Sequence, residues 1–417
     1  MPRIIVTFAS VVALGLATFT TTPSLAASPE ATVGLAEVLS SVLQNGPEAI
    51  LPKARHLEGE AEALGVSSLP DLEVETLVPF RKAKAGNSAE VQVTQPFRPS
   101  DFGSRRSLAK SLRDIADIEA RVKALDLMHK AAGIYTEAWV LQERENLYRR
   151  NLQSAKTTEA SLKQAISEGR ADPAEVQLFS AEKLRLDQRL QEMDAARQER
   201  LAELGRLAAI SSLSTFQLTR PDKAPLPANF ESIEVLSEKP ASLRRLFQAR
   251  ADMAGKRLAV AKQDSVVGSF APRLNLGRDY DSGSSSLSAG VVFTLPLWGR
   301  NRSEVISAEA EQLQAQSGLQ AIKGGQFEDL LRRTYAKAKQ GVTTAESYRS
   351  QIVPAFRSVH ALAIKRFQNG QSSVLDLWTV RERLTDVEEA SLTAVAASMD
   401  ARVALETLIG NSLEMTP

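Results

Sequence analysis

A helical pattern that continues for about sixty residues is the strongest constraint on how this chain can fold. From Arg105 to about Ser167, apolar residues recur in steps of three and four, which places them on one face of an α-helix. At about 1.5 Å per residue this helix is a rod on the order of 90 Å long, so it cannot fold back into an ordinary compact core. Its apolar face consists of Leu108, Leu112, Ile115, Ile118, Val122, Leu125 and Met128.

A turn and a returning helix follow each of two such long patterns. Gly169 and Gly370 mark the two turns, since glycine readily takes the left-handed conformation that ends a helix. Gly324-Gly325, Gly341 and Pro354 interrupt the second long pattern, so we expect kinks or a split in it. The expected helices cover about 104–167, 173–210, 302–368 and 374–409.

Apolar and polar residues alternate between residues 287 and 297, as in a strand with one apolar face. The segment Val91 to Phe97 has the same design some two hundred residues earlier. Each segment ends near a proline, which cannot donate a ladder hydrogen bond. The residues expected at the joints between strand and helix are Pro96, Pro296, Trp298 and Gly299. The expected strands cover about 71–78, 89–97, 272–280 and 287–297, which makes two hairpins.

Ordered markers repeat at a separation of 200 to 202 residues, which indicates an internal duplication. We expect a first repeat over 28–210 and a second over 240–417, each built as helix, hairpin, long helix, turn and returning helix. Clustered prolines predict an irregular linker over 211–239. The marker pairs are Pro70 with Pro272, Pro96 with Pro296, Gly169 with Gly370 and Leu207 with Leu408.

Residues 1–27 have the features of a cleaved secretory signal peptide, with an N-terminal membrane anchor as the alternative interpretation. Arg3 precedes an apolar run, and Ser24-Leu25-Ala26 is a small-x-small cleavage signal. No run of about twenty apolar residues follows, so no transmembrane helix is expected. The chain has no cysteine, which excludes disulfides and a lipid-anchor cysteine. A formal net charge of +1 points to no nucleic-acid partner.

Two hairpins supply four strands, fewer than the about eight that the smallest membrane barrel needs. If the strands enter a membrane they must close into a barrel, because lipid cannot satisfy open sheet edges. Closure therefore requires several copies of the chain, and the long helices need lateral partners as well. A symmetric oligomer with a shared barrel above a helical tube meets both demands, and such an object is a conduit.

The sequence resembles the outer-membrane efflux proteins of the TolC family over nearly the whole mature chain. The strand end Gln95-Pro96, followed by a glycine and basic residues, is most similar to the branch that serves heavy-metal cation pumps. The segments that carry the resemblance are Val42–Pro47, Val91–Pro96, Phe293–Arg300, Arg366–Leu377 and Arg381–Leu384.

The resemblance implies a mainly α fold with a small β part, a TolC-like duct. Three copies of four strands would form a β-barrel in outer-membrane lipid, on top of a long periplasmic α-helical barrel. The resemblance further implies a homotrimer that docks to a periplasmic adaptor, or membrane fusion protein, and to an inner-membrane efflux pump. Its function would be passive export, with heavy-metal cations as the cargo that the branch suggests.

The resemblance also suggests where the duct narrows and where it docks. Acidic residues after the second turn ring the periplasmic constriction in the family, and Asp376 falls on one such position. Thr379 stands where some members have a second acid, and Ser372 where some have arginine, so the gate network is only partly present. Asp376 could equally be a carboxylate favoured by the helix dipole. The expected adaptor-docking tips comprise Gly169, Arg170, Arg366, Phe367 and Gly370.

Other classes of function remain open at this level. A soluble periplasmic coiled-coil adaptor or scaffold would account for the rods but not for the duplicated hairpins. A duct for drugs or secreted proteins would have the same architecture. His56, His129 and His360 lie far apart without metal-ligand spacing, and no nucleophile elbow, phosphate loop or zinc motif is present. We therefore expect neither an enzyme nor a cofactor.

Overall fold

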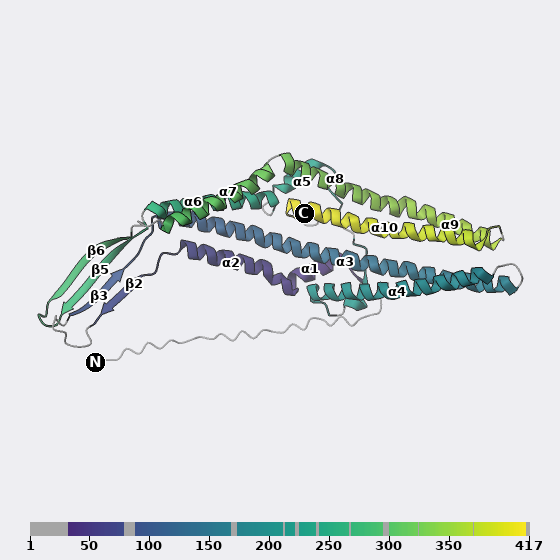
Figure 1. Cartoon of the computed structure of the whole chain (residues 1–417), viewed down its shortest axis with the longest axis horizontal. Helices are drawn as coiled ribbons and strands as arrows, with labels where there is room; N and C mark the ends of the chain where they lie inside the picture. The colour runs from purple at the N-terminus through teal and green to yellow at the C-terminus, as the bar shows by residue number, and fades with distance from the viewer. Residues whose placement is uncertain are drawn as a thin grey trace.

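The protein is an elongated rod with a β-sheet at one end and the paired ends of long helices at the other (Figure 1). The computed structural model describes residues 32–78, 88–167, 173–211, 213–221, 225–238, 242–266, 268–294, 300–323, 325–369 and 371–413. The signal peptide expected over 1–27 lies outside these residues, as do Pro296, Trp298 and Gly299 of the expected joints.

The first half is dominated by helix α3 (Ser104–Ser167), whose 64 residues make a rod of roughly 95 Å. Helix α4 (Pro173–Ala208) returns along it, and α2 (Ile50–Ser67) packs on its sheet-proximal part. The other elements are β1 (Thr32–Val33), α1 (Leu35–Gln44), the 3₁₀ helix Pro47–Ala49, β2 (Glu73–Leu77), β3 (Ser88–Thr94) and the 3₁₀ helix Pro99–Phe102.

The second half repeats this plan, with the long helix divided. The expected helix 302–368 is split into α7 (Arg300–Lys323), α8 (Gly325–Ser347), a π-helix (Tyr348–Ile352) and α9 (Val353–Gln368). The π-helix stands directly before Pro354, whose missing N–H cannot continue the α-helical ladder. Gly341 does not interrupt helix α8. The absence of a Cβ there lets α10 approach closely, since a Cβ would lie 3.1 Å from the Ser398 Cα. The remaining elements are a 3₁₀ helix (Leu213–Thr215), β4 (Gln217–Leu218), α5 (Phe230–Ser237), α6 (Leu243–Val266), β5 (Ser269–Asp279), β6 (Ser285–Thr294) and α10 (Val374–Ile409).

The segment expected as an irregular linker, 211–239, contains helix α5, so that prediction was wrong in part. Ile233 and Leu236 lie on one face of α5 and are buried against α8 and α10. Burial of this face stabilises an eight-residue helix that would be marginal alone. Strand β4 in the same segment pairs in parallel with β1, which the sequence analysis did not anticipate.

The two hairpins join into one antiparallel sheet with the strand order β2-β3-β5-β6. The contact between the halves is β3 with β5, where Val91 pairs with Leu276 and Val93 with Leu274. Strand β3 ends at Thr94, three residues before the predicted end at 97. Phe97 continues as a single bridge to Phe270.

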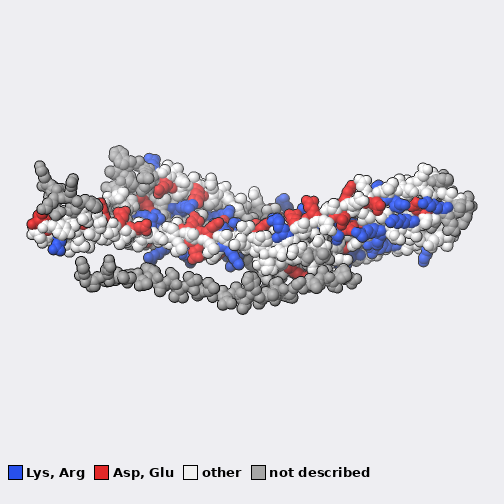
Figure 2. Space-filling model, turned by 90° about the horizontal axis from the view of Figure 1, so that it is seen from below, with Lys and Arg blue, Asp and Glu red and all other residues white. Residues whose placement is uncertain are grey.

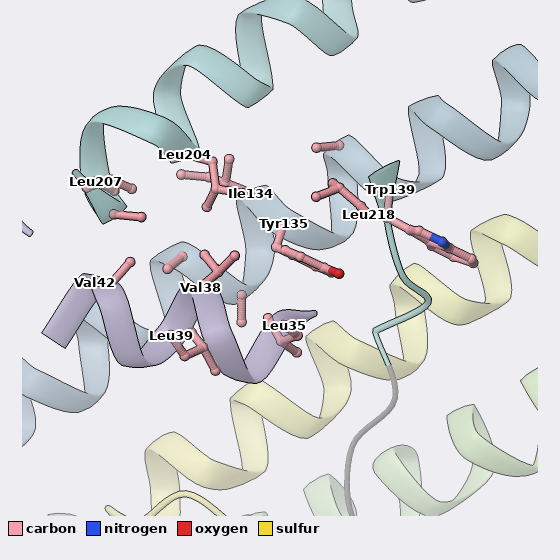
Figure 3. Packing of buried hydrophobic residues seen from close by; sticks show 14 of the residues in the cluster. Leu35, Val38, Leu39, Val42, Ile134, Tyr135, Trp139, Leu204, Leu207 and Leu218 are labelled. Atoms are coloured by element: carbon pink, nitrogen blue, oxygen red, sulfur yellow. The ribbon is translucent and has the colours of Figure 1, made fainter. Parts of the chain in front are cut away.

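The largest core lies where α1 packs against α3 and α4, midway along the rod (Figure 3). The Tyr135 ring is fully buried there, and its hydroxyl lies 2.9 Å from the Val33 carbonyl oxygen and 2.8 Å from that of Thr219. The hydroxyl of Tyr335, 200 residues later, lies 2.7 Å from the Pro227 carbonyl oxygen and 2.9 Å from that of Ala228. The duplication therefore extends to the hydroxyl groups that anchor the segment entering each repeat. Within the described ranges, no helix combines the length and apolar character needed to cross a membrane.

Candidate functional site

The four-stranded sheet has one apolar face that no described part of the chain covers. Strand pairing sets Val74, Val93 and Leu274 side by side in one row, and Val91, Leu276 and Leu287 in the next. Most of these side chains are exposed; Leu276, in the middle, has 48% of its surface accessible. Exposed apolar area of this kind normally marks a membrane or protein contact. Thr76 and Arg278 also lie on this face, whose apolar residues are Val74, Val91, Val93, Pro272, Leu274, Leu276, Leu287, Ala289, Val291 and Phe293.

The opposite face of the sheet is polar. The row Glu75, Gln92, Asn275 and Ser288 runs across all four strands. Acidic residues Glu73 and Glu90 and the basic Arg273 lie on the same face, as their pairing shows. Because side chains alternate along each strand, lipid on the apolar face would leave water on this one. Strands β2 and β6 are the edges of the sheet, so their outer hydrogen-bonding groups are free to pair with another chain.

Three phenylalanine rings stand where the sheet meets the helices. Phe97 stacks on Phe270 with a centroid distance of 5.7 Å, and Phe102 stacks on Phe270 at 6.0 Å. Phe102 is 71% exposed. Pro96 lies beside this group, and the Gln95 side chain donates to the Pro70 carbonyl 2.9 Å away. Aromatic rings in such a place favour a membrane interface.

At the opposite end, Asp376 lies in the first turn of α10 and caps that helix. Its carboxylate accepts from the Ser373 hydroxyl at 2.8 Å and from the Ser373 N–H at 3.1 Å, while its own N–H donates to the Ser373 hydroxyl. These hydrogen bonds lower the pKa of the Asp376 carboxyl, so it is ionised at neutral pH. The side chain is exposed, and capping leaves its charge available to solvent.

The other predicted constriction residues lie close by. Thr379 is exposed one turn further along α10, and its hydroxyl donates to the Leu375 carbonyl 2.9 Å away. Ser372 is half-buried, and its hydroxyl oxygen has no hydrogen-bond partner among the described residues. The chain therefore brings Asp376, Thr379 and Ser372 together at one tip.

The predicted docking tips are only partly described. Gly169, Arg170 and Gly370 lie outside the described residues. Arg366 is exposed near the end of α9. Phe367 is half-buried against a cluster of Leu162, Phe179 and Val374, so it belongs to the packing between the two helical hairpins as well as to the tip.

A polar network behind the tips was not found from the sequence. Arg381 of α10 is 6% exposed and donates from its guanidinium to the Ser154 hydroxyl at 2.6 Å and to the Asn151 backbone carbonyl. Tyr148 of α3 donates to the Glu389 carboxylate of α10 and accepts from Arg189 of α4. The sequence named Arg381 only as part of the segment Arg381–Leu384 that carries the family resemblance, without a partner or a role.

Metal ligation finds no support in the part of the chain that the structure describes. No group of three or more His, Asp or Glu side chains there is arranged to hold a metal ion. His129 lies 3.2 Å from Glu406, and His56 lies 2.6 Å from Asp117, each in a two-residue contact. Both contacts connect neighbouring helices.

A four-stranded sheet with one exposed apolar face, at the end of long paired helices, defines the class of fold. Residues 244–411 match the family described as outer membrane efflux protein. The chain is 25% identical over 330 residues to the pyoverdine export outer membrane protein OpmQ of Pseudomonas putida, an alignment that covers 74% of this chain and 66% of that relative. The chain thus spans slightly less than two thirds of the relative's length.

Solved structures share the fold at low sequence identity. The outer membrane protein VceC of Vibrio cholerae superposes with a TM-score of 0.70 at 16% identity, covering 91% of this chain and 97% of that one. The CmeC outer membrane channel of Campylobacter jejuni gives a TM-score of 0.71 at 15% identity, covering 92% and 87%. The family match covers residues 244–411, and the chain shares its fold with these solved structures. It has the TolC-like duct fold of these outer membrane proteins.

Proposed function

We propose that three copies of the chain form a passive export duct, with a shared barrel in the outer membrane and a helical tube in the periplasm. The observation that carries this proposal is the sheet with one exposed apolar face, one polar face and two edge strands. Pairing β6 of one copy with β2 of the next removes every edge, as lipid requires. The polar row through Asn275 then faces a water-filled lumen.

The soluble-scaffold alternative conflicts with this sheet. A scaffold in water would expose Leu276, Leu287 and Phe293 to solvent together, which favours aggregation. The proposal is tested by fractionation followed by gel migration with and without heating. We expect a heat-modifiable trimer in the outer membrane that requires detergent for extraction. A monomer in the soluble periplasmic fraction would contradict the duct.

We also propose that the tips formed by 168–172 and 369–373 dock a periplasmic adaptor, which in turn connects the duct to an inner-membrane pump. Gly370→Asp is expected to abolish export while trimers still assemble, because a bulky charge then stands on the docking surface. Export is measured as sensitivity of the producing strain to the cargo. Gly65→Asp is the matched control, since Gly65 lies in α2 near the sheet and has open space around it. Loss of trimers in Gly370→Asp alone would favour a purely structural role for the turn.

Asp376 is proposed to form a ring of three carboxylates at the constriction. Asp376→Asn is expected to lower the cation preference of single channels about two- to tenfold, because fixed negative charge in a narrow pore concentrates cations. Planar-bilayer recordings in asymmetric salt provide the measurement. Ser373→Ala separates charge from capping: it weakens the helix cap, which is worth about 1 kcal/mol, and keeps the carboxylate. Equal loss of selectivity in both variants would assign the effect to the cap.

For the cargo we propose heavy-metal cations, as the sequence resemblance suggests, with a siderophore such as the pyoverdine of the OpmQ relative as the second candidate. The acidic side chains of Glu73, Glu75 and Glu90 on the polar face favour cations. A deletion strain tested for metal sensitivity and for siderophore secretion distinguishes the two. Sensitivity to metals with normal secretion supports cation export, and the reverse result assigns the siderophore.

A further inference from the structure

A cavity of about 250 Å³ lies between the α3/α4 hairpin and the α9/α10 hairpin, a few turns behind the tips. Phe179 and Trp378 form one wall, with their rings edge to face at a centroid distance of 5.1 Å. Ile364 of α9 lies on the apolar side, while Ser154 and Arg381 bring polar groups. The cavity therefore combines aromatic walls with a cation.

Arg381 is almost completely buried but forms no ion pair with a carboxylate of the described residues, and Glu182 of α4 only raises its pKa through a longer-range charge interaction. Its guanidinium donates to the Ser154 hydroxyl at 2.6 Å and to the Asn151 side-chain oxygen at 3.2 Å, both uncharged acceptors. No carboxylate of the described chain lies within 4.0 Å of it. Burial lowers the pKa of Arg381 to about 10. By contrast Arg402, equally buried, pairs with the Glu406 carboxylate at 3.0 Å. A buried cation without an anionic partner is costly, so an anion in the cavity would be stabilised.

The surroundings also suit an anion. Burial and the nearby Arg381 lower the pKa of His360, which lines the cavity, so its ring is neutral at pH 7 and can donate a hydrogen bond. Figure 2 shows Lys and Arg side chains gathered on the tip half of one face. On α3, Arg149, Arg150 and Lys163 are exposed, each also paired with a carboxylate. Such a field attracts negatively charged ligands.

We propose that this cavity binds a small carboxylate with an apolar body, the carboxylate against the Arg381 guanidinium and the body against Phe179 and Trp378. A volume slightly below the roughly 300 Å³ of the smallest common ligand sites fits a molecule the size of benzoate. Two N–H groups of a guanidinium match the two oxygens of a carboxylate. The walls come from α3, α4, α9 and α10, so an occupant holds the two hairpins together. The cavity extends to Phe367 near the tips, and the proposed ligand is neither the adaptor nor the exported cargo.

Isothermal titration of benzoate into the purified full-length protein in detergent tests this site. We expect saturable binding by the wild-type protein and at least about tenfold weaker binding of benzyl alcohol, which has the ring without the charge. Benzylammonium, with the opposite charge, is expected not to bind. Binding of the alcohol as tightly as benzoate, or no benzoate binding up to solubility, would overturn the proposal.

Variants identify the site itself. Arg381→Gln keeps a hydrogen-bonding side chain without the charge and is expected to weaken benzoate binding at least about tenfold. Ile364→Phe fills the cavity without touching the guanidinium and is expected to abolish binding, which decides the matter if Arg381→Gln fails to fold. Arg357→Gln is the control, since Arg357 is 60% exposed and pairs with Glu388 outside the cavity. Unchanged affinity in folded Ile364→Phe would place benzoate elsewhere and refute the assignment.

Discussion

Leu276→Arg is expected to prevent assembly of the protein in the outer membrane. Leu276 lies in the centre of the apolar face between Val91 and Leu287, and it is exposed. In the proposed trimer this face meets lipid, where an arginine at the membrane midplane costs about 2–4 kcal/mol in each copy. Three copies carry the change, so the total exceeds what a marginally stable assembly tolerates. The measurement is the amount of heat-modifiable trimer in the outer-membrane fraction.

The adjacent residue gives a matched control. Asn275 lies on the opposite face between Gln92 and Ser288, which is the lumen side in the proposed trimer. Asn275→Arg adds the same side chain one residue away, yet it is expected to assemble normally because water solvates the new charge. Normal assembly of Leu276→Arg would show that the apolar face does not contact lipid. Failure of both variants would mean that the sheet tolerates arginine on neither face.

The strands were predictable because their physical signature is local. Alternation from Leu287 to Phe293 requires one apolar face whatever the rest of the chain does. Two prolines, Pro96 and Pro296, marked where the alternation stops, although β3 itself ends at Thr94. The register between the halves, Val91 with Leu276, could not be predicted, since it depends on contacts across almost two hundred residues.

Elements that are stabilised by residues distant in the sequence could not be predicted from local patterns. Helix α5 is stabilised because Ile233 and Leu236 are buried against α8 and α10. The residues that flank it are rich in proline, which predicts turns and not a helix. The absence of a side chain at Gly46 is required by close packing. A Cβ there would lie 2.3 Å from the Leu207 carbonyl oxygen at the end of α4. Neither requirement is visible without the partner helix.

In the candidate site too, residues with local contacts could be predicted and residues with distant partners could not. Asp376 was singled out because it follows a turn in a pattern similar to the family's, and its cap with Ser373 is a local contact between residues three apart. Its place at a constriction stays a prediction. The role of Arg381 was not found, because its acceptors on Asn151 lie 230 residues away in the sequence. A basic residue within a helical pattern usually indicates a solvated face. Only the packing of α10 on α3 makes Arg381 a buried cation.

Glu406→Ala is expected to lower the free energy of unfolding by about 3–5 kcal/mol. The Glu406 carboxylate is 1% exposed and lies 3.0 Å from the Arg402 guanidinium and 3.2 Å from His129 of α3. It also accepts from the Leu413 N–H at 3.3 Å, so it fixes the end of the chain after α10. Its removal deprives a buried arginine of its counter-charge. Denaturant unfolding of the detergent-solubilised protein, followed by circular dichroism, measures the change.

An exposed pair and a double substitution separate charge burial from simple loss of a glutamate. Glu346→Ala removes the partner of Arg349, but both side chains are more than half exposed, so the expected loss is below about 1 kcal/mol. Arg402→Met combined with Glu406→Leu is expected to regain most of the lost stability, because it removes both charges and keeps apolar volume. If the double variant were as unstable as Glu406→Ala, the contacts of Glu406 with His129 and Leu413, and not the charge of Arg402, would carry the stability. The contrast between Arg402 and Arg381 then becomes quantitative: one buried arginine depends on a carboxylate within the chain, and the other depends on neutral acceptors and the proposed ligand.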